Sequence, residues 1–401
     1  MKQNFFILIG IFFLLELYVY QAFKTLVANF YGRVAYITVT LAIYGLVSYN
    51  LALLNKTSSE THRLYIVTTL FFVAIVPKIL VTLFLLVDDI SRVFQWIFLR
   101  LSSTETHYPE RRKFLSLLGL GTAGIISALV LDGVVFGKYR HKVRKVKLTI
   151  KNLPKSFKGY KIIQISDVHS GSFSNPEKLR GAINLINGQN ADLVLFTGDM
   201  VNNEATEFAP MVDLFKSIKA KDGKFSVLGN HDYGEYIQWE SQKAKTDNLQ
   251  YLIDLQTQAG FQLLRNEHRA IEKNGERIYI LGVENWGLKP FPQYGDLDRA
   301  VAGIPQNAPK ILMSHDPTHF DEKVKQHPAD IALTLSGHTH GMQFGLDLKN
   351  HRWSPVQYRY PKWADLYESN GKYLYVNRGF GVIGFSGRVG MLPEITLIEL
   401  Q

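Results

Sequence analysis

Four long apolar runs constrain this chain of 401 residues more than any other feature of its sequence. They cover roughly residues 5–23, 34–54, 64–87 and 114–136. Each is close to the length of about 20 residues that a helix needs to cross the hydrocarbon core of a bilayer. A helical domain buried in water is the alternative, and four runs of this length disfavour it. We therefore expect residues 1–137 to form a transmembrane region of about four helices.

Polar residues inside two of these runs indicate a bundle. Glu16 lies within the first run, and Pro77 and Lys78 lie within the third. Polar groups at such depth usually face neighbouring helices rather than lipid, so we expect the helices to pack together. Between the third and fourth runs, residues 90–101 predict an amphipathic helix at the membrane interface, with Trp96 as its headgroup-level anchor.

The start of the fourth run resembles a twin-arginine export signal. Arg111 and Arg112 are followed by Phe114-Leu115 and an uncharged stretch rich in Gly and Ala. The internal position departs from a normal signal, and an ordinary positively charged helix flank remains an equal alternative. The positive residues of the loops do not decide the orientation. The arginine pair favours a C-terminal domain on the outer side of the membrane.

A basic run follows the last apolar segment. Its members are Lys138, Arg140, Lys142, Arg144, Lys145 and Lys147. This position predicts a juxtamembrane linker, residues 138–149, that faces anionic lipid headgroups. No motif of stacking aromatic residues accompanies it, so we expect no nucleic-acid partner. The chain has no cysteine, which excludes disulfides, thiolate metal sites and cysteine nucleophiles.

Residues 150–401 read as a soluble α/β domain, because short apolar strands alternate with helical patterns. Strands are expected near 147–151, 161–166, 192–197, 224–228, 261–265, 277–283, 310–314, 331–335, 372–377 and 394–400. Helices are expected near 176–189, 207–219, 236–259, 296–302 and 318–326. The aromatic, irregular segment 342–370 is too long for a plain connection and predicts a lid or wall.

Five of these strands end in residue types that ligate metals. The residues are Asp167, His169, Asp199, Asn230, His231, Asp232, His315, His338 and His340. In α/β sheets, sites collect outside the carboxyl ends of strands, so these side chains can meet in one crevice. Asp, His and Asn without Cys suit Mn, Fe or Zn. The number of ligands favours two ions over one. Taken singly, each motif could be a turn, a cap or a surface pair.

The five motifs together resemble those of calcineurin-like metallophosphoesterases. They are Asp167-Val168-His169, Gly198-Asp199-Met200-Val201-Asn202, Gly229-Asn230-His231-Asp232, Ser314-His315-Asp316 and Gly337-His338-Thr339-His340. The resemblance covers roughly residues 145–401. The closing segments Asn377–Gly381 and Leu392–Leu397, with Gly341-Met342-Gln343, are similar to the branch that contains membrane-associated and exported bacterial phosphodiesterases. Some members of that branch hydrolyse the pyrophosphate of UDP-2,3-diacylglucosamine.

The resemblance implies two packed sheets flanked by helices and two divalent metal ions. One ion would be held by Asp167, His169, Asp199 and His340. The other would be held by Asp199, Asn230, His315 and His338. Asp199 would bridge them together with a hydroxide that attacks phosphorus. His231 would lie near the leaving oxygen as general acid or as a charge stabiliser, with Asp232 orienting its imidazole. Two positions depart from the branch pattern: Met342 stands where a second glycine is common, and Asn202 stands where a carboxylate is optional. Neither is expected to contact a metal ligand.

The sequence thus predicts a membrane-anchored, dinuclear phosphoesterase. Its substrate would be a phosphodiester or pyrophosphate, for example of a phospholipid or a lipid A precursor. The four runs predict a multi-pass protein, and the branch it resembles indicates a bacterial inner membrane. The arginine pair favours a catalytic domain on the periplasmic side. The alternative from another class is a non-catalytic membrane sensor that binds metal and a phosphorylated ligand. A transporter is disfavoured, because few polar residues besides Glu16 and Lys78 lie within the runs.

Overall fold

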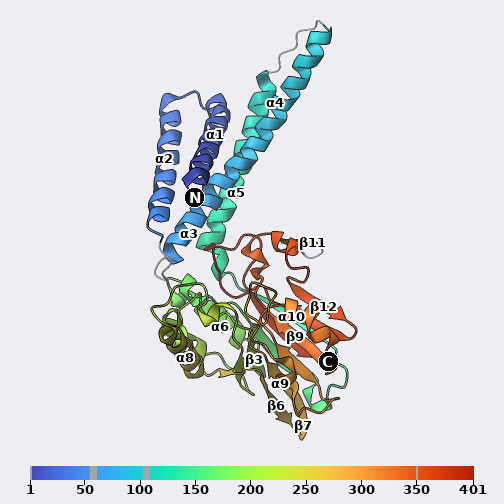
Figure 1. Cartoon of the computed structure of the whole chain (residues 1–401). Coiled ribbons are helices and arrows are strands. Elements are labelled where there is room, and N and C mark those ends of the chain that lie inside the picture. The colour runs from blue at the N-terminus through green and yellow to red at the C-terminus, as the bar shows by residue number, and fades with distance from the viewer. Residues whose placement is uncertain (1, 55–60, 103–108, 349–350) are drawn as a thin grey trace. The chain divides into compact units, whose positions relative to one another are not determined.

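A computed structural model describes residues 2–54, 61–102, 109–348 and 351–401 (Figure 1). The chain separates into two compact units, the first comprising residues 1–54 and 63–134 and the second residues 55–62 and 135–401. The first unit consists of long helices, and the second unit contains two β-sheets with short helices on their faces. The predicted fold class, an apolar helical region followed by a two-sheet α/β domain, is confirmed.

The helices of the first unit coincide with the apolar runs. They are α1 (Lys2–Leu26), α2 (Phe30–Ala52), α3 (Thr61–Leu70), a π-helical turn (Phe71–Ile75), α4 (Val76–Ser102) and α5 (Pro109–Val135). Within the described residues, three stretches are long and apolar enough to cross a bilayer: Phe30–Ala52, His62–Phe98 and Glu110–Tyr139. These three stretches support the prediction that the chain is a membrane protein.

The predicted interfacial helix at residues 90–101 does not form a separate element. Helix α4 runs without a break from Val76 to Ser102 and therefore includes both the end of the third apolar run and the amphipathic segment. Residues 87–90, where we expected a break, contain neither Gly nor Pro to end a helix.

A proline explains the π-helical turn ahead of α4. Pro77 has no N–H, so it cannot donate to the carbonyl of Val73, four residues earlier. The side chain of Ser127 in α5 donates to this carbonyl over 2.7 Å. A neighbouring helix thus satisfies the backbone acceptor that the proline leaves open, as an apolar environment requires.

Two ion-pair clusters link the helices of the first unit. Lys78 pairs with Glu16 at 2.5 Å, and the hydroxyls of Tyr36 and Tyr44 donate to the same carboxylate over 3.1 and 2.9 Å. The polar residues of the first and third runs therefore face each other, as the sequence predicts. Each charge is paired, which lowers the cost of placing it in a bilayer.

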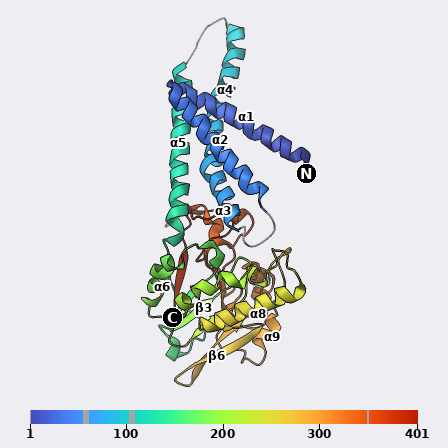
Figure 2. The same cartoon turned by 90° about the vertical axis from the view of Figure 1, so that its left-hand side faces the viewer.

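The second cluster contains the arginine pair. The fully buried carboxylate of Asp88 in α4 contacts Arg111 at 2.7 Å and Arg112 at 3.3 Å, both at the start of α5. Arg112 also contacts Asp89 at 2.8 Å. The two helices lie side by side in both views of Figures 1 and 2. The pair resembles an export signal in sequence, and in the folded chain it joins α4 to α5.

The second unit contains two six-stranded sheets. Their strands, with a separate hairpin of β10 and β11, are β1 (Lys142–Leu148), β2 (Lys161–Ile165), β3 (Leu193–Phe196), β4 (Lys224–Ser226), β5 (Gln262–Leu263), β6 (Glu267–Lys273), β7 (Glu276–Gly282), β8 (Lys310–Met313), β9 (Ile331–Ser336), β10 (Leu346–Leu348), β11 (His351–Trp353), β12 (Asp365–Ser369), β13 (Lys372–Val376) and β14 (Glu394–Leu400). The strand orders are β1-β14-β2-β3-β4-β5 and β12-β13-β9-β8-β7-β6. At the centre of each sheet the strands are parallel, with β2, β3 and β4 in one and β7, β8 and β9 in the other.

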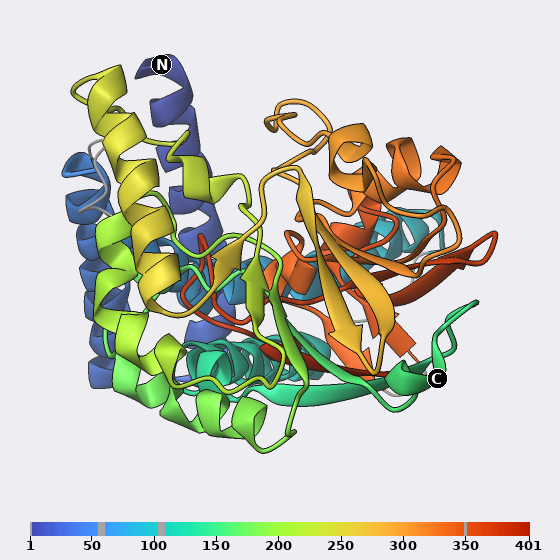
Figure 3. The ribbon, with the colours of Figure 1, turned by 90° about the horizontal axis from the view of Figure 1, so that it is seen from below.

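The two sheets pack face to face, and helices cover their outer sides. Residues such as Ile162, Leu195 and Ile280 form one buried cluster between the sheets. The helices are α6 (Arg180–Asn187), α7 (Val212–Lys216), α8 (Gln242–Gln258), α9 (Leu297–Val301) and α10 (Thr318–Glu322). In Figure 3, α6 and α8 lie on one side of the paired sheets, and α9 and α10 lie on the other. Two further apolar clusters fill these outer layers.

Several boundaries differ from the sequence prediction. Most of the expected basic linker is strand β1, which pairs in parallel with β14 and belongs to the sheet. Strand β6, which is mostly charged and exposed, lacks the apolar pattern from which strands are predicted. Helix α8 begins six residues later than expected, because the side chain of Ser241 accepts a hydrogen bond from the backbone of Ala244 and caps the helix. Pro210 interrupts the expected helix at 207–219.

Ser127→Ala should destabilise the first unit, because it leaves the Val73 carbonyl without its donor. We expect a loss of about 0.6–1.7 kcal/mol, the range measured for hydrogen bonds between membrane helices. Unfolding of the full chain in mixed detergent micelles, followed by circular dichroism, measures it. Thr122→Ala in the same helix is the matched control. Equal stability of the two variants would contradict the role of Ser127.

Candidate metal centre

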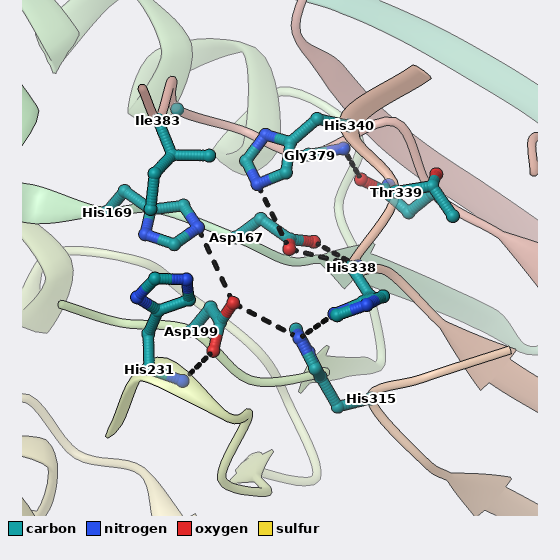
Figure 4. Close-up of polar contacts among 12 residues, drawn as sticks. Asp167, His169, Asp199, His231, His315, His338, Thr339, His340, Gly379 and Ile383 are labelled. Carbon is teal, nitrogen blue, oxygen red and sulfur yellow. Dashed lines mark hydrogen bonds and ion pairs between the residues drawn. The ribbon is translucent and has the colours of Figure 1, made fainter. Parts of the chain in front are cut away.

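The residues predicted from the strand ends lie together at the carboxyl ends of the central strands (Figure 4). Five of them have backbone φ values in the left-handed region: Asp167 (54°), His169 (47°), Asp199 (60°), His338 (71°) and His340 (53°). This conformation is uncommon and costly for residues other than Gly, and it clusters at functional sites. The fold therefore forces the turn after each strand to aim its side chain inward.

Two glycines allow the carboxylates to approach the neighbouring loops. A Cβ atom on Gly229 would collide with the side chain of Asp199, and one on Gly337 would collide with the side chain of Asp167. Gly198, before Asp199, has φ of +99°. The glycines that flank the motifs are thus required both for the turn and for close contact with a carboxylate.

One group of possible metal ligands consists of Asp167, His169 and His340. Their nearest ligand atoms all lie within 4.8 Å of one another, and all three residues are buried. His340 Nε2 lies 3.3 Å from Asp167 Oδ1. The two histidine rings are 4.9 Å apart between centroids.

A second group consists of Asp199, His315 and His338, whose ligand atoms also lie within 4.8 Å of one another. Asp199 Oδ2 lies 3.1 Å from His315 Nε2 and 3.5 Å from His169 Nε2, which belongs to the first group. The Oδ1 atom of Asn230 is 2.9 Å from His338 Nδ1. Asp199 therefore lies between the two groups, and Figure 4 shows its carboxylate pointing between the two sets of histidines.

The donor atoms of both groups fit divalent cations. Among the described residues, both ring nitrogens of His169 and the Nε2 atom of His340 are buried without a hydrogen-bond partner. A buried polar atom without a partner costs about 1–3 kcal/mol, which a cation bound at these atoms would offset. Carboxylate oxygens and imidazole nitrogens are ligands for Mn, Fe and Zn. The residues present therefore fit two ions that share Asp199.

Two buried carboxylates, those of Asp167 and Asp199, bring negative charge into this site. Burial alone would raise the pKa of Asp167, but the neighbouring His340 outweighs it and holds this pKa well below the ordinary value. Burial alone would lower the pKa of His315, whereas the adjacent Asp199 raises it to about 10. In the metal-free chain, a proton on His315 therefore compensates part of the charge that a cation would otherwise neutralise.

His231 lies beside both groups without belonging to either. Its Nδ1 atom is 2.7 Å from the carbonyl oxygen of Asn202, and its backbone N–H donates to Asp199 Oδ1 over 2.9 Å. Because a carbonyl only accepts hydrogen bonds, the proton sits on Nδ1 and the ring orientation is fixed from the backbone. The ring centroid lies 5.0 Å from that of His169 and 4.5 Å from that of Tyr236.

The expectation that Asp232 orients the His231 imidazole is wrong, because Asn202 contacts that ring instead. The buried carboxylate of Asp232 accepts backbone hydrogen bonds from Asp199 (2.9 Å), Met200 (2.7 Å), Val201 (3.3 Å) and Gly229 (2.9 Å). Asp232 thus holds together the two loops that carry Asp199 and Asn230. Burial, followed by the charge of Asp199, raises the pKa of Asp232 to about 7.

Four residues that were not predicted to bind metal or to take part in catalysis also contact the predicted ligands. Tyr360 Oη lies 2.9 Å from His338 Nε2, and Asp316 Oδ2 lies 3.5 Å from the same nitrogen. These contacts leave His338 Nδ1 facing the second group, the usual arrangement for a metal-ligating histidine. The buried Arg388 lies 3.2 Å from His340 Nδ1, and Asn230 Nδ2 donates to Tyr236 Oη over 2.7 Å.

Only one of these four contacts had a signal in the sequence. Tyr360 belongs to the irregular segment 342–370 that was expected to form a wall, and it does lie against the site. Tyr236 and Arg388 lie in loops without a strand-end pattern. Asp316 adjoins His315, but a lone carboxylate at that position is more often a cap, and here it also accepts from the Thr318 backbone.

Four other histidines of this domain, none of them in a strand-end motif, lie outside the site. His319 is buried and contacts the Ser314 hydroxyl at 2.8 Å. His268 contacts the carbonyl of Ala300 at 2.9 Å. His351 is exposed on β11, and His327 contacts Asp298 at 2.9 Å.

Comparisons with known proteins agree with this geometry. The family described as "Probable Calcineurin-like phosphoesterase, transmembrane domain" matches residues 2–138, and the family described as "Calcineurin-like phosphoesterase" matches residues 160–342. The uncharacterized metallophosphoesterase YkuE of Bacillus subtilis is 30% identical over 300 residues, which cover 73% of this chain and 98% of that protein.

The names of two further relatives mention a membrane or a lipid-linked substrate. A transmembrane protein with metallophosphoesterase domain from Danio rerio is 27% identical over 285 residues, covering 69% of this chain and 61% of the relative. This chain therefore spans about three fifths of that relative. The UDP-2,3-diacylglucosamine pyrophosphatase LpxG of Chlamydia trachomatis is 26% identical over 311 residues, covering 64% of this chain and 89% of that protein.

Asp232→Asn should destabilise the second unit by about 2–4 kcal/mol, because the amide group would leave buried backbone N–H groups without an acceptor. Denaturant unfolding of the full chain in the presence of a chelator measures this loss. Asp213→Asn, on the exposed side of α7, is the matched control. Normal stability with a displaced pH–rate profile would instead show that Asp232 acts on His231.

Metal binding should release a proton from His315. Since the pKa of His315 is raised to about 10 in the metal-free chain, the cation and the proton compete for the ring below that pH. Affinity for Mn²⁺ should therefore rise as the pH increases toward 10. Calorimetry at pH 8 in buffers of different ionisation enthalpy counts the protons released. His231→Gln should release the same number, whereas no release from the unchanged chain would contradict the prediction.

Proposed function

This chain belongs to the calcineurin-like phosphoesterase family, and on that premise we propose that it hydrolyses a phosphodiester or pyrophosphate bond of a lipid-linked substrate at the membrane. The observation that carries this proposal is the pair of buried ligand groups that share Asp199, with His231 beside them. A single metal site would not need a carboxylate between two sets of histidines.

The two groups of candidate ligands support the ligand sets that the resemblance implies. We propose that one divalent ion is held by Asp167, His169, Asp199 and His340. The other would be held by Asp199, Asn230, His315 and His338. The ions, which we propose to be Mn, Fe or Zn, would supply a nucleophile at neutral pH and neutralise charge on the attacking and leaving oxygens of an in-line displacement.

The remaining residues position the ligands and move protons. Asp232 holds the loops that carry Asp199 and Asn230, so the shared carboxylate keeps its place. Tyr360 and Asp316 fix the ring of His338, and Arg388 faces the ring of His340. The Asn202 carbonyl keeps the Nδ1 atom of His231 protonated, so its Nε2 atom is the one that would take up a second proton and deliver it to the leaving oxygen.

A lipid-linked substrate is supported by the membrane helices of this chain and by the name of the relative from Chlamydia trachomatis. We propose a phospholipid or a lipid A precursor as the substrate. The same observations lead us to propose a multi-pass location in a bacterial inner membrane. The arginine pair at the start of α5 favours a catalytic domain on the periplasmic side.

Two substitutions separate hydrolysis from ligand binding. The full chain in detergent should hydrolyse bis-(p-nitrophenyl) phosphate with added Mn²⁺, and Asp199→Asn should abolish both tight metal binding and turnover. His231→Gln should keep the metal and lose about 10²–10⁴-fold in kcat, the usual contribution of a general acid. Metal bound without turnover in the unchanged chain would indicate a sensor rather than an enzyme.

The orientation is testable because the chain has no cysteine of its own. Lys273→Cys, at the exposed end of β6, provides a single thiol in the second unit. A membrane-impermeant maleimide should label it in cells whose outer membrane has been permeabilised. Labelling only after the inner membrane is also lysed would place the catalytic domain in the cytoplasm.

A further inference from the structure

The hairpin of β10 (Leu346–Leu348) and β11 (His351–Trp353) follows the metal ligand His340 in the chain. The two strands pair antiparallel, with Leu346 opposite Trp353, Asp347 opposite Arg352 and Leu348 opposite His351. Side chains alternate between the faces of a strand, so one face carries Leu346, Leu348, His351 and Trp353. The other face carries Asp347 and Arg352.

The charged face of the hairpin points toward the domain. Asp347 forms an ion pair with Arg144 of β1 and lies 3.6 Å from the fully buried Arg378. Arg352 forms an ion pair with Asp365 of β12. The carboxylate of Asp347 is only 10% exposed. These ion pairs fix the hairpin to the second unit through its polar side chains.

The apolar face of the hairpin points away from the domain. Leu346 is 57% exposed, Leu348 62% and Trp353 40%. The nearby residues Met342 and Tyr358, before and after the hairpin in the chain, are also strongly exposed. This is the reverse of the usual pattern, in which a hairpin buries its apolar face and exposes its charges. An outward apolar face held in place by inward ion pairs indicates a surface that meets another apolar phase.

The path of the chain indicates that the apolar phase facing the hairpin is the lipid bilayer. Arg144, which contacts the hairpin, follows Val135, the last residue of α5, after a stretch of chain that extends at most about 30 Å. The short 3₁₀ helix Gly137–Tyr139 shortens that reach. The hairpin is thus bound to the strand by which the chain leaves its last apolar helix. Trp is enriched at the membrane interface, and Leu accompanies it on segments whose apolar face is buried at the boundary between headgroups and acyl chains.

We propose that the outward face of this hairpin, formed by Leu346, Leu348 and Trp353, inserts into the headgroup region of the bilayer. The occupant of this surface is membrane lipid. The inference does not depend on turnover. Its consequence for catalysis, which rests on the proposed function, is that His340 lies only six residues before Leu346, so the docked hairpin holds the metal centre at the level where a lipid headgroup lies.

A fluorescence experiment on the full chain tests this contact directly. Because the chain has no cysteine, Leu348→Cys provides a single attachment site for an environment-sensitive nitrobenzoxadiazole dye. The labelled protein is reconstituted into vesicles of phosphatidylcholine and phosphatidylglycerol that contain a doxyl-labelled lipid quencher near the headgroups. Lys273→Cys is the control, at the turn of β6 and β7, which Figure 1 shows at the far end of the second unit from β11.

We expect a blue-shifted emission and several-fold stronger quenching for the dye at position 348 than at position 273. Equal quenching at the two positions would overturn the proposal. His351→Cys, on the same face, repeats the test should Leu348→Cys fold poorly.

Hydrolysis separates this proposal from the proposed function. The double substitution Leu346→Ser and Leu348→Ser should leave turnover of soluble bis-(p-nitrophenyl) phosphate unchanged, since neither side chain contacts a ligand residue in the described structure. Quenching at position 348 without any hydrolysis would support the membrane contact and contradict the proposed enzymatic function. Hydrolysis without quenching would support the enzymatic function and contradict the membrane contact.

Discussion

The buried carboxylate of Asp199 is the element on which the metal centre depends. One of its oxygens lies 3.5 Å from His169 and 3.1 Å from His315, and the other accepts the backbone N–H of His231. A charge held at this depth is costly unless it is paired, and a cation bound between the two ligand groups would pair it. The loops around Asp199 hold its carboxylate between the two groups.

Backbone geometry keeps that carboxylate in place. The positive φ values of Asp199 and its fellow ligands turn each strand end inward, and Asp232 fastens the loops by accepting their N–H groups. Gly229 leaves the space that Asp199 occupies. Strain at the site is thus offset by hydrogen bonds from residues that need not touch substrate. The parallel strands of the two packed sheets supply the rigid frame on which these loops are mounted.

The sequence predicted that these side chains converge, because each follows an apolar strand and strand ends meet at one edge in an α/β fold. It could not predict the partner of His231, since the Asn202 carbonyl is a backbone atom that every residue offers. Tyr236 and Arg388 reach the site from loops whose course depends on tertiary packing. The charged strand β6 and the basic strand β1 lack an apolar alternation, because they lie at sheet edges. The prediction of a separate helix at residues 90–101 was wrong, because no helix-breaking residue separates this segment from the third apolar run.

The most direct test of a carboxylate shared by two metal ions is electron paramagnetic resonance of the Mn²⁺-loaded full chain. Ions that share Asp199 lie close enough to be exchange-coupled, so the spectrum should show a coupled pair that Asp199→Asn converts to isolated ions or removes. A spectrum of isolated Mn²⁺ in the unchanged chain at saturating metal, identical to that of Asp199→Asn, would contradict the shared centre and with it the two-metal account of this site.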